Sequence, residues 1–281
     1  MKKNIILMCL GVALCAHAGF IKEGMEAKEQ GDHKKLIETY DKACQEGKAS
    51  GCYNLGVLYE EGTGNVEKNL DKARALYEKS CEGGFASGCY NLGLMYAEGK
   101  SVKMDVQKAK ELYEKACNDN DDSACTNLGL MHAEGKLGSA DFTKAFELYT
   151  KACQSGNFVG CSNLGFLHAE GKGVNKDLKK AKELYEKACG GDVMMACDNL
   201  GLLNSEGRSI TQNYAKAKEL FEKACNQGYV KSCNNLAILY AEGKGVSTDY
   251  EKAKALFKSS CDKGMSVSCE NYTLLNSPQT K

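Results

Sequence analysis

DVQKAKELYEKACNDNDDSACTNLGLMHAEG, residues Asp105 to Gly135, contains two helical patterns separated by a short polar turn. In both patterns apolar residues recur at spacings of three and four, the period of an α-helix with one buried face. The same double pattern returns about every 36 residues along the 281-residue chain. A two-helix repeat of this length predicts an α-solenoid, in which stacked helix pairs share one continuous core.

The first helix of each repeat has a recognisable start and end. It begins at an Asn or Asp, whose side chain can accept hydrogen bonds from free backbone N–H groups. It ends three residues after a Cys, at a residue type that tolerates a left-handed backbone. The predicted starts are Asn69, Asp105, Asp141, Asp177, Asn213 and Asp249. The predicted ends are Gly47, Gly84, Asn120, Gly156, Asp192, Gly228 and Gly264.

The second helix is predicted to open near the second Cys of the repeat, and its positions are numbered here from that Cys. Leu at +3 is followed by Gly at +4 in five repeats, as in Leu92-Gly93 and Leu128-Gly129. Glycine inside a helix costs about 1 kcal/mol, so we expect a neighbouring helix to approach closely there. Positions +5 and +6 are also apolar, as expected for a helix packed between neighbouring repeats.

The two ends of the repeat array depart from the pattern. Residues 19–31 resemble a second helix without its Cys, and the helix from Cys269 has Tyr272 and Thr273 in place of Leu and Gly. We therefore predict an all-α fold: a right-handed α-solenoid of about seven helix pairs with a terminal capping helix, forming one domain over residues 19–281.

The N-terminus has the features of a secretory signal peptide. Lys2 and Lys3 precede an apolar run that is too short to span a bilayer, and Ala16-His17-Ala18 fits a small-x-small cleavage site. We expect residues 1–18 to be removed and the protein to be secreted or periplasmic. Cys15 allows a lipoprotein alternative, but Leu14 is bulky where a small residue is expected.

Fourteen of the sixteen cysteines follow the predicted signal peptide, in seven pairs with a separation of eight residues. We predict one local disulfide per helix pair, joining the end of the first helix to the start of the second. Structural zinc sites, the alternative, need four ligands at shorter spacings, so we expect no metal and no other cofactor. The predicted pairs are Cys44 with Cys52, Cys81 with Cys89, Cys117 with Cys125, Cys153 with Cys161, Cys189 with Cys197, Cys225 with Cys233, and Cys261 with Cys269.

The motif LGxxYxxG…DxxKAxxLYxKAC resembles the Sel1-like repeat, a relative of the tetratricopeptide repeat, and covers essentially all of residues 19–281. The cysteine pair in every unit is similar to that of the Helicobacter cysteine-rich proteins. This resemblance implies an exported solenoid with one disulfide per helix pair. The broader class consists mainly of adaptor and interaction proteins, whereas some cysteine-rich members have been described as penicillin-binding proteins or weak β-lactamases.

Motifs for catalysis are sparse. The one S-x-x-K sequence, Ser260 to Lys263, straddles a Cys at a helix end and lacks the K-T/S-G element of serine β-lactamases. His132 and His168 occupy +7 of adjacent repeats, where Tyr stands in others. They could form a metal or acid–base pair, or simply replace Tyr at a packing position. We assign no catalytic residue.

Two polar columns suggest a binding surface. Asn recurs at +2 and Glu at +9, about 20° apart around the helix, nearly opposite the Cys–Leu–Gly stripe. Asn can pair with the backbone of an extended peptide, and Glu favours cationic side chains. The alternative is structural, with Asn bonding a neighbouring repeat and Glu pairing with lysines such as Lys108. The hypothetical peptide-binding residues, on a concave groove, are Asn91, Asn127, Asn163, Asn199 and Asn235.

The charge balance limits the class of partner. The chain has 37 basic and 37 acidic residues, so nothing indicates nucleic acid or an anionic membrane surface. Lysine columns on the first helix, such as Lys115, Lys151 and Lys187, are interpreted as a solvated face. We expect a monomer that binds a protein or peptide partner. The alternative from the resemblance is a β-lactam or cell-wall-related ligand with slow hydrolysis.

Overall fold

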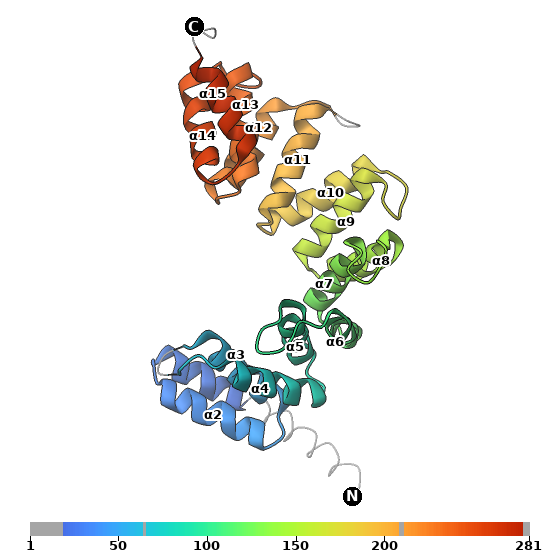
Figure 1. Ribbon diagram of the computed structural model, residues 1–281, viewed down its shortest axis with the longest axis vertical. Helices are drawn as coiled ribbons and strands as arrows, with labels where there is room; N and C mark the ends of the chain where they lie inside the picture. Colours follow the sequence, from blue (N-terminus) through green and yellow to red (C-terminus); the bar gives the residue numbers. More distant parts are fainter. Residues whose placement is uncertain (1–18, 64–65, 208–210, 278–281) are drawn as a thin grey trace, which may run out of the picture. The chain divides into compact units, whose positions relative to one another are not determined.

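The computed structural model describes residues 19–63, 66–207 and 211–277, and the predicted signal peptide lies outside them. These residues contain α-helices and no strand, and they fall into two compact units, Met1–Ala140 and Asp141–Lys281. Within each unit, helices that follow one another in the chain pack side by side (Figure 1). The predicted all-α solenoid of bridged helix pairs is confirmed.

The N-terminal unit contains a helical segment at 19–29 and six further helices. These are α2 (His33–Gln45), α3 (Ala49–Glu61), α4 (Leu70–Glu82), α5 (Ala86–Glu98), α6 (Val106–Asn118) and α7 (Asp122–Ala133). The C-terminal unit contains α8 (Phe142–Gln154), α9 (Phe158–Glu170), α10 (Leu178–Gly190), α11 (Met194–Glu206), α12 (Tyr214–Asn226), α13 (Val230–Glu242), α14 (Tyr250–Asp262) and α15 (Ser266–Asn276).

The first helices begin and end at the predicted residues. Each predicted Asn or Asp is the N-cap, as where Asp105 Oδ1 accepts a hydrogen bond of 2.9 Å from the Lys108 N–H. Just beyond each helix, the predicted residue has a left-handed backbone; φ is 82° at Gly84 and 65° at Asn120. The second helices start three residues before their Cys, near the predicted position.

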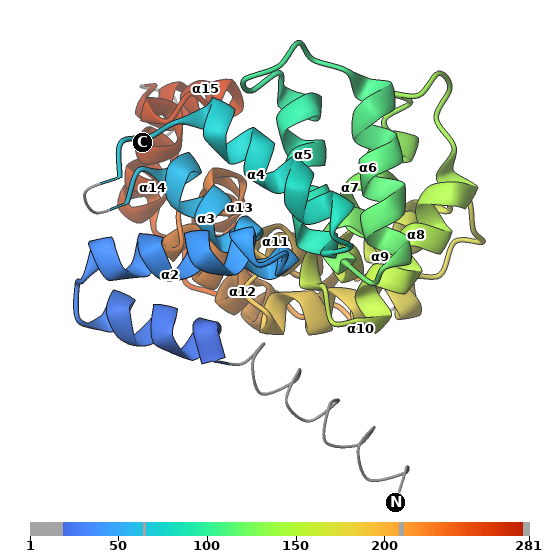
Figure 2. The same ribbon diagram turned by 90° about the horizontal axis from the view of Figure 1, so that it is seen from below.

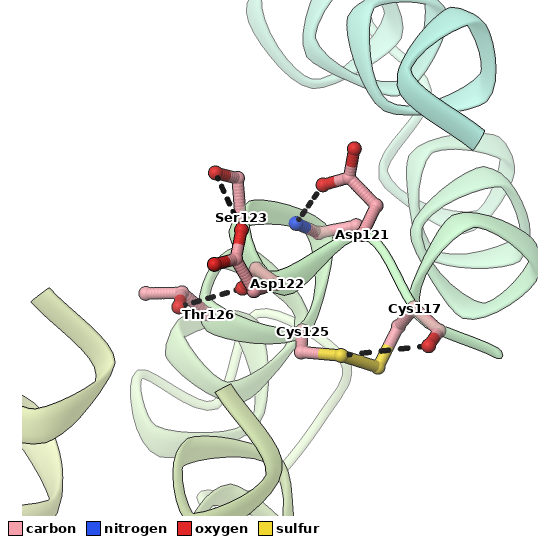
Figure 3. The surroundings of a disulfide bond; sticks show 7 residues. Cys117, Asp121, Asp122, Ser123, Cys125 and Thr126 are labelled. Atoms are coloured by element: carbon pink, nitrogen blue, oxygen red, sulfur yellow. Dashed lines mark hydrogen bonds between the residues drawn. A yellow bond between two sulfur atoms is a disulfide. The ribbon is translucent and has the colours of Figure 1, made fainter. Parts of the chain in front are cut away.

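The seven disulfides join the predicted cysteine pairs. Cys117 lies in the last turn of α6 and Cys125 near the start of α7, with Cα atoms 4.7 Å apart (Figure 3). Between them Asp121 caps α7 through a 2.9 Å hydrogen bond from the Ala124 N–H. Each bridge therefore ties two antiparallel helices together at one turn.

The glycine at +4 makes room for an aromatic ring. A Cβ atom added to Gly93 would lie 2.7 Å from Cε1 of Tyr113, whose helix α6 follows in the next repeat. Gly201 faces Phe221 in the same way, at 2.5 Å. The close approach predicted from these glycines is confirmed, and the approaching group is the ring of the following first helix.

The N-terminal helical segment covers the first helix pair. Phe20 and Ala27 of this segment share a buried cluster with Leu36 and Tyr40 of α2. Figure 2 shows the segment lying beside α2. This position agrees with its predicted role as a cap on the first repeat.

Candidate binding surface

A pocket of similar composition recurs at three places between second helices. In the N-terminal unit it occupies about 480 Å³ between α5, α6 and α7. In the C-terminal unit two equivalents, of about 190 and 200 Å³, adjoin α9 to α11 and α11 to α13. Each is lined by +5, +8 and +9 of one second helix, by the aromatic residue of the following first helix, and by +2, +5 and +6 of the next second helix.

Apolar side chains at +5 give these pockets an exposed apolar rim. Leu130 at the first pocket is 38% exposed, and Phe166 at the second is 42% exposed. The neighbouring Leu at +3 is buried in both repeats, so the helix supplies a core on one side and accessible apolar surface on the other. Accessible apolar surface beside polar groups is a feature of protein-interaction sites.

The Asn at +2 forms one wall of each pocket, as Asn127, Asn199 and Asn235 show. All five Asn predicted to bind peptide are partly buried. Asn127 Nδ2 lies 3.5 Å from the Tyr90 hydroxyl of the preceding repeat. Asn235 Nδ2 likewise donates to Asp198 Oδ1, at 2.9 Å. The amide groups of these two residues therefore hold neighbouring repeats together, which is the structural alternative considered for this column.

The Glu at +9 is exposed along the whole column. Three of these carboxylates pair with the Lys two residues later, beyond the glycine that ends the helix. The pairs are Glu98 with Lys100, Glu134 with Lys136, and Glu242 with Lys244. In the remaining pocket Glu170 is a lining residue, and Lys172 instead lies over the rings of Phe142 and Phe166. The lysines at positions such as Lys108 pair within the first helix instead, as Lys108 does with Glu111.

One lysine column of the predicted solvated face is largely exposed, but its side chains also contact the preceding repeat. Lys115 Nζ donates a 2.8 Å hydrogen bond to the Cys81 carbonyl of the preceding repeat. Lys187 and Lys223 bind Cys153 and Cys189 in the same way, at 2.9 and 2.8 Å. Each of these carbonyls already accepts a hydrogen bond from a backbone N–H of the following turn, and the ammonium group adds a second hydrogen bond at the negative end of the helix dipole. The helical period places this lysine on an outer face of its own helix. That period does not show that the preceding repeat lies within reach of the side chain.

A second feature missed from the sequence is a polar ladder at +1. The Asp198 carboxylate, 4% exposed, accepts hydrogen bonds from Ser232 Oγ at 2.5 Å and from Asn235 Nδ2. Burial raises the pKa of Asp198, and these two hydrogen bonds oppose that rise. One repeat later Asn234 accepts from Ser268, at 2.9 Å. The signal for these contacts is a Ser placed 34 residues after an Asp or Asn.

Neither candidate for catalysis forms a catalytic arrangement. Ser260 is 1% exposed and its Oγ has no hydrogen-bond partner among the described residues, whereas Lys263 is the exposed C-cap of α14. His168 packs edge-on against the Phe146 ring at 5.6 Å, and burial lowers the pKa of its imidazole. His132 belongs to the other unit. These placements support a chance motif and a packing histidine.

Residues 19–63, 66–207 and 211–277 contain no group of three or more His, Cys, Asp or Glu side chains that could hold a metal ion. Within these ranges no helix has the length and apolar character needed to cross a membrane.

The chain is similar to several known proteins. The "Putative beta-lactamase HcpC" of Helicobacter pylori is 40% identical over 81 residues, which cover 25% of this chain and 27% of that protein. The crystal structure of a Sel1 repeat protein from Oxalobacter formigenes matches with a TM-score of 0.79 and 26% identity, covering 86% of this chain and 99% of that one. The c5321 protective antigen of uropathogenic Escherichia coli matches with a TM-score of 0.75 and 29% identity, covering 84% and 50%.

The match to HcpC thus spans about a quarter of that relative, and the match to c5321 spans half of that antigen. The family model for the Sel1 repeat matches residues 49–85, 86–121, 122–157, 159–192, 195–229 and 230–265. These six segments cover more than half of the sequence, so the chain belongs to the Sel1 repeat family.

Proposed function

We propose that this chain is an exported, disulfide-stabilised repeat protein that binds a protein or peptide partner along the face formed by its second helices. The observation that carries the proposal is the recurrence of one pocket, built from the same repeat positions, at three places. Sel1 repeats generally mediate protein interactions. A peptide that places side chains in the two successive pockets of the C-terminal unit would gain affinity from several weak contacts at once.

The lining residues suggest what such a partner presents. The +5 residues offer apolar contact, and the exposed Glu column lies beside them. A segment that combines apolar and basic side chains fits this surface. Three of the five predicted Asn residues, Asn127, Asn199 and Asn235, form a pocket wall. Asn127 and Asn235 are held there by hydrogen bonds to the preceding repeat.

The binding test uses two exposed apolar residues of the same helix. Partners are identified by pull-down with the oxidised protein, and the affinity of the purified partner is then measured by calorimetry. We expect Phe166→Asp to weaken binding about tenfold or more, because an anchor at the pocket is lost. The matched control is Val159→Asp, which changes a 46% exposed residue of α9 that lines none of the three pockets. Equal affinities for the two folded variants would refute the pocket assignment.

Export is the second part of the proposal. Seven disulfides are typical of a protein that folds in an oxidising compartment. Residues 1–18 are proposed to act as the signal peptide, with residues 19–281 as the processed solenoid. N-terminal sequencing of the protein recovered outside the cytoplasm should begin at Gly19. A chain still beginning at Met1 in that fraction would contradict cleavage at this site.

The β-lactam alternative rests on the name of a relative that matches over a quarter of this chain. The one serine in an S-x-x-K motif is buried, and its hydroxyl is not directed at a lysine. We therefore expect the disulfide-intact protein not to hydrolyse nitrocefin. Turnover that disappears in Ser260→Ala would reverse this assignment.

A further inference from the structure

The seven disulfides differ in how well they are covered. In the first five bridges every cysteine is at most 6% exposed. In the sixth, Cys225 is partly exposed whereas Cys233 is 5% exposed. In the seventh, both Cys261 and Cys269 are partly exposed. Thiol–disulfide exchange requires an attacking sulfur to reach the bridge, so exposed bridges are the labile ones.

Lysine contacts from the next repeat account for part of this difference. Lys187 Nζ lies 2.9 Å from the Cys153 carbonyl oxygen and 3.9 Å from Cys153 Sγ, against the bridge itself. Lys223 and Lys115 occupy the same repeat position and bind the equivalent cysteine carbonyls. In the seventh repeat this position is Ser259, which has no ammonium group to place over Cys225.

The helix attached to the most exposed bridge is also the most weakly buried. Ser268 is the one buried residue of α15, whereas the other second helices each have five or more. Tyr272 and Leu275 of α15 are partly buried against the cluster that contains Leu239 and Phe257. An element with few buried contacts has a small free energy of local opening, and opening would expose the bridge further.

We propose that Cys261–Cys269 is a thiol–disulfide exchange site that reacts with low-molecular-weight thiols. Cys261 lies in the last turn of α14, and Cys269 is the fourth residue of α15. A negative charge is better tolerated near a helix N-terminus than near a C-terminus, so Cys269 is the better leaving group. An incoming thiolate therefore bonds to Cys261 Sγ, the Cys261–Cys269 bond breaks, and its electron pair stays on Cys269.

A second thiolate completes the reaction by attacking the mixed disulfide on Cys261. The small-molecule disulfide leaves and Cys261 becomes a thiolate, so two thiols are oxidised as one bridge is reduced by two electrons. Each protein thiolate takes a proton from water. The consequence is loss of the covalent link between α14 and α15, with the covered bridges left intact.

Differential alkylation tests the site in the full oxidised protein. The protein is incubated with reduced glutathione, quenched with iodoacetamide at intervals, and digested for mass mapping of each cysteine. We expect Cys261 and Cys269 to become modified about tenfold faster than the cysteines of the first five bridges, in the order of exposure. Labelling of all bridges at one rate, or of a buried bridge first, would overturn the proposal.

The intermediate and three variants test the details. Glutathione is expected on Cys261, and an adduct found on Cys269 would overturn the assigned leaving group. The double variant Cys261→Ala, Cys269→Ala should lose the fast phase while the first five bridges keep their rates. Ser259→Lys should slow labelling of Cys225, and Lys187→Ser should speed labelling of Cys153. Unchanged rates in both lysine variants would refute protection by this side chain.

Discussion

Position +1 of the second helix contacts the following repeat in different ways in the two units. In the N-terminal unit this position carries Tyr53 and Tyr90. The Tyr53 ring centroid lies 5.2 Å from that of Phe85, and the Tyr90 centroid lies 5.9 Å from that of Tyr113. These joints are contacts between tilted aromatic rings, which gain most of their energy from buried apolar area.

In the C-terminal unit the same position carries Asp198 and Asn234, which accept hydrogen bonds from Ser232 and Ser268. A buried polar joint gains little net energy when satisfied but costs much more when one partner is missing. The comparison shows that the same repeat position can contact the next repeat in two ways: through buried apolar surface, or through a hydrogen bond to one specific partner. The two solutions should respond differently to substitution and to pH.

The largest expected effect comes from the aromatic joint. Tyr113 is 2% exposed and contacts both Tyr90 and the space left by Gly93. Tyr113→Ala would leave a cavity at this joint and should lower the free energy of unfolding by about 3–5 kcal/mol. Urea titration followed by circular dichroism measures the loss.

Tyr113→Phe is the matched control, because it keeps the ring and removes only the hydroxyl beside Asn127. Its expected cost is about 1 kcal/mol. If the Phe variant lost as much stability as the Ala variant, the joint would depend on the hydroxyl, and the contrast between the two units would fail.

The polar joint should show coupling between specific partners. Asp198→Ala leaves the Ser232 hydroxyl and the Asn235 amide without their acceptor and is expected to cost about 1–3 kcal/mol. Adding Ser232→Ala to this variant should recover part of the loss, because one orphaned donor is removed. A double-mutant cycle by urea unfolding gives the coupling energy. If the stability losses of Asp198→Ala and Ser232→Ala simply added in the double variant, the two residues would not be coupled, and the specific partner at this position would not matter.

Of the two kinds of contact made by position +1, the one through Asp198 should respond to acid. Burial raises the pKa of the Asp198 carboxyl, whereas its hydrogen bonds to Ser232 and Asn235 and the charge of Lys231 lower it. Burial and then the Asp198 charge raise the pKa of Tyr229. Because the folded pKa is raised, the stability contributed by protonation is fully present below the unfolded pKa, near 3.9, and is lost as pH rises through the folded pKa.

The free energy of unfolding of the parent relative to Asp198→Asn should therefore increase as pH falls from 7 towards about 4. Parallel urea titrations across this range measure the difference. The aromatic joints contain no carboxylate at +1, so Tyr90→Phe should leave the slope of the parent unchanged over the same range. A constant difference between the parent and Asp198→Asn would contradict titration of this group.

Much of the fold could be predicted because its determinants are local and repeated. Asp105 caps its helix with its own side chain. Cys117 and Cys125 meet because a separation of eight residues spans the short connection between two antiparallel helices. The glycine at +4 also correctly predicted close packing, because glycine destabilises a helix interior unless a neighbouring group packs against it. None of these inferences required knowledge of which repeat lies next in space.

The candidate site was less predictable, because its contacts are not local and cross from one repeat to the next. Periodicity places Lys115 and Asn127 on outer faces of their own helices, but both reach the preceding repeat. The pocket wall was inferred from the Asn column, whereas the exposed apolar rim at +5 was taken only as packing surface. A search for complementary pairs 34 residues apart would have found Asp198 with Ser232.

The smallest expected effect is a gain of stability at an incomplete joint. Ser162 occupies +1 of α9, is fully buried, and its hydroxyl has no hydrogen-bond partner among the described residues. The residue 34 positions later is Ala196, where the polar joints of the following repeats have Ser232 and Ser268. Ala196→Ser adds one oxygen at a position that accepts Ser in those two joints.

This substitution should raise the free energy of unfolding by about 0.5–1 kcal/mol, because it gives the Ser162 hydroxyl a partner. In a Ser162→Ala background the same change should instead destabilise, because the new hydroxyl would be the orphan. Chemical denaturation of the two single variants and the double variant decides between these signs. If Ala196→Ser had the same effect in both backgrounds, a partner 34 residues away would not be what completes the joint, and the ladder would be a feature of Asp198 and Asn234 alone.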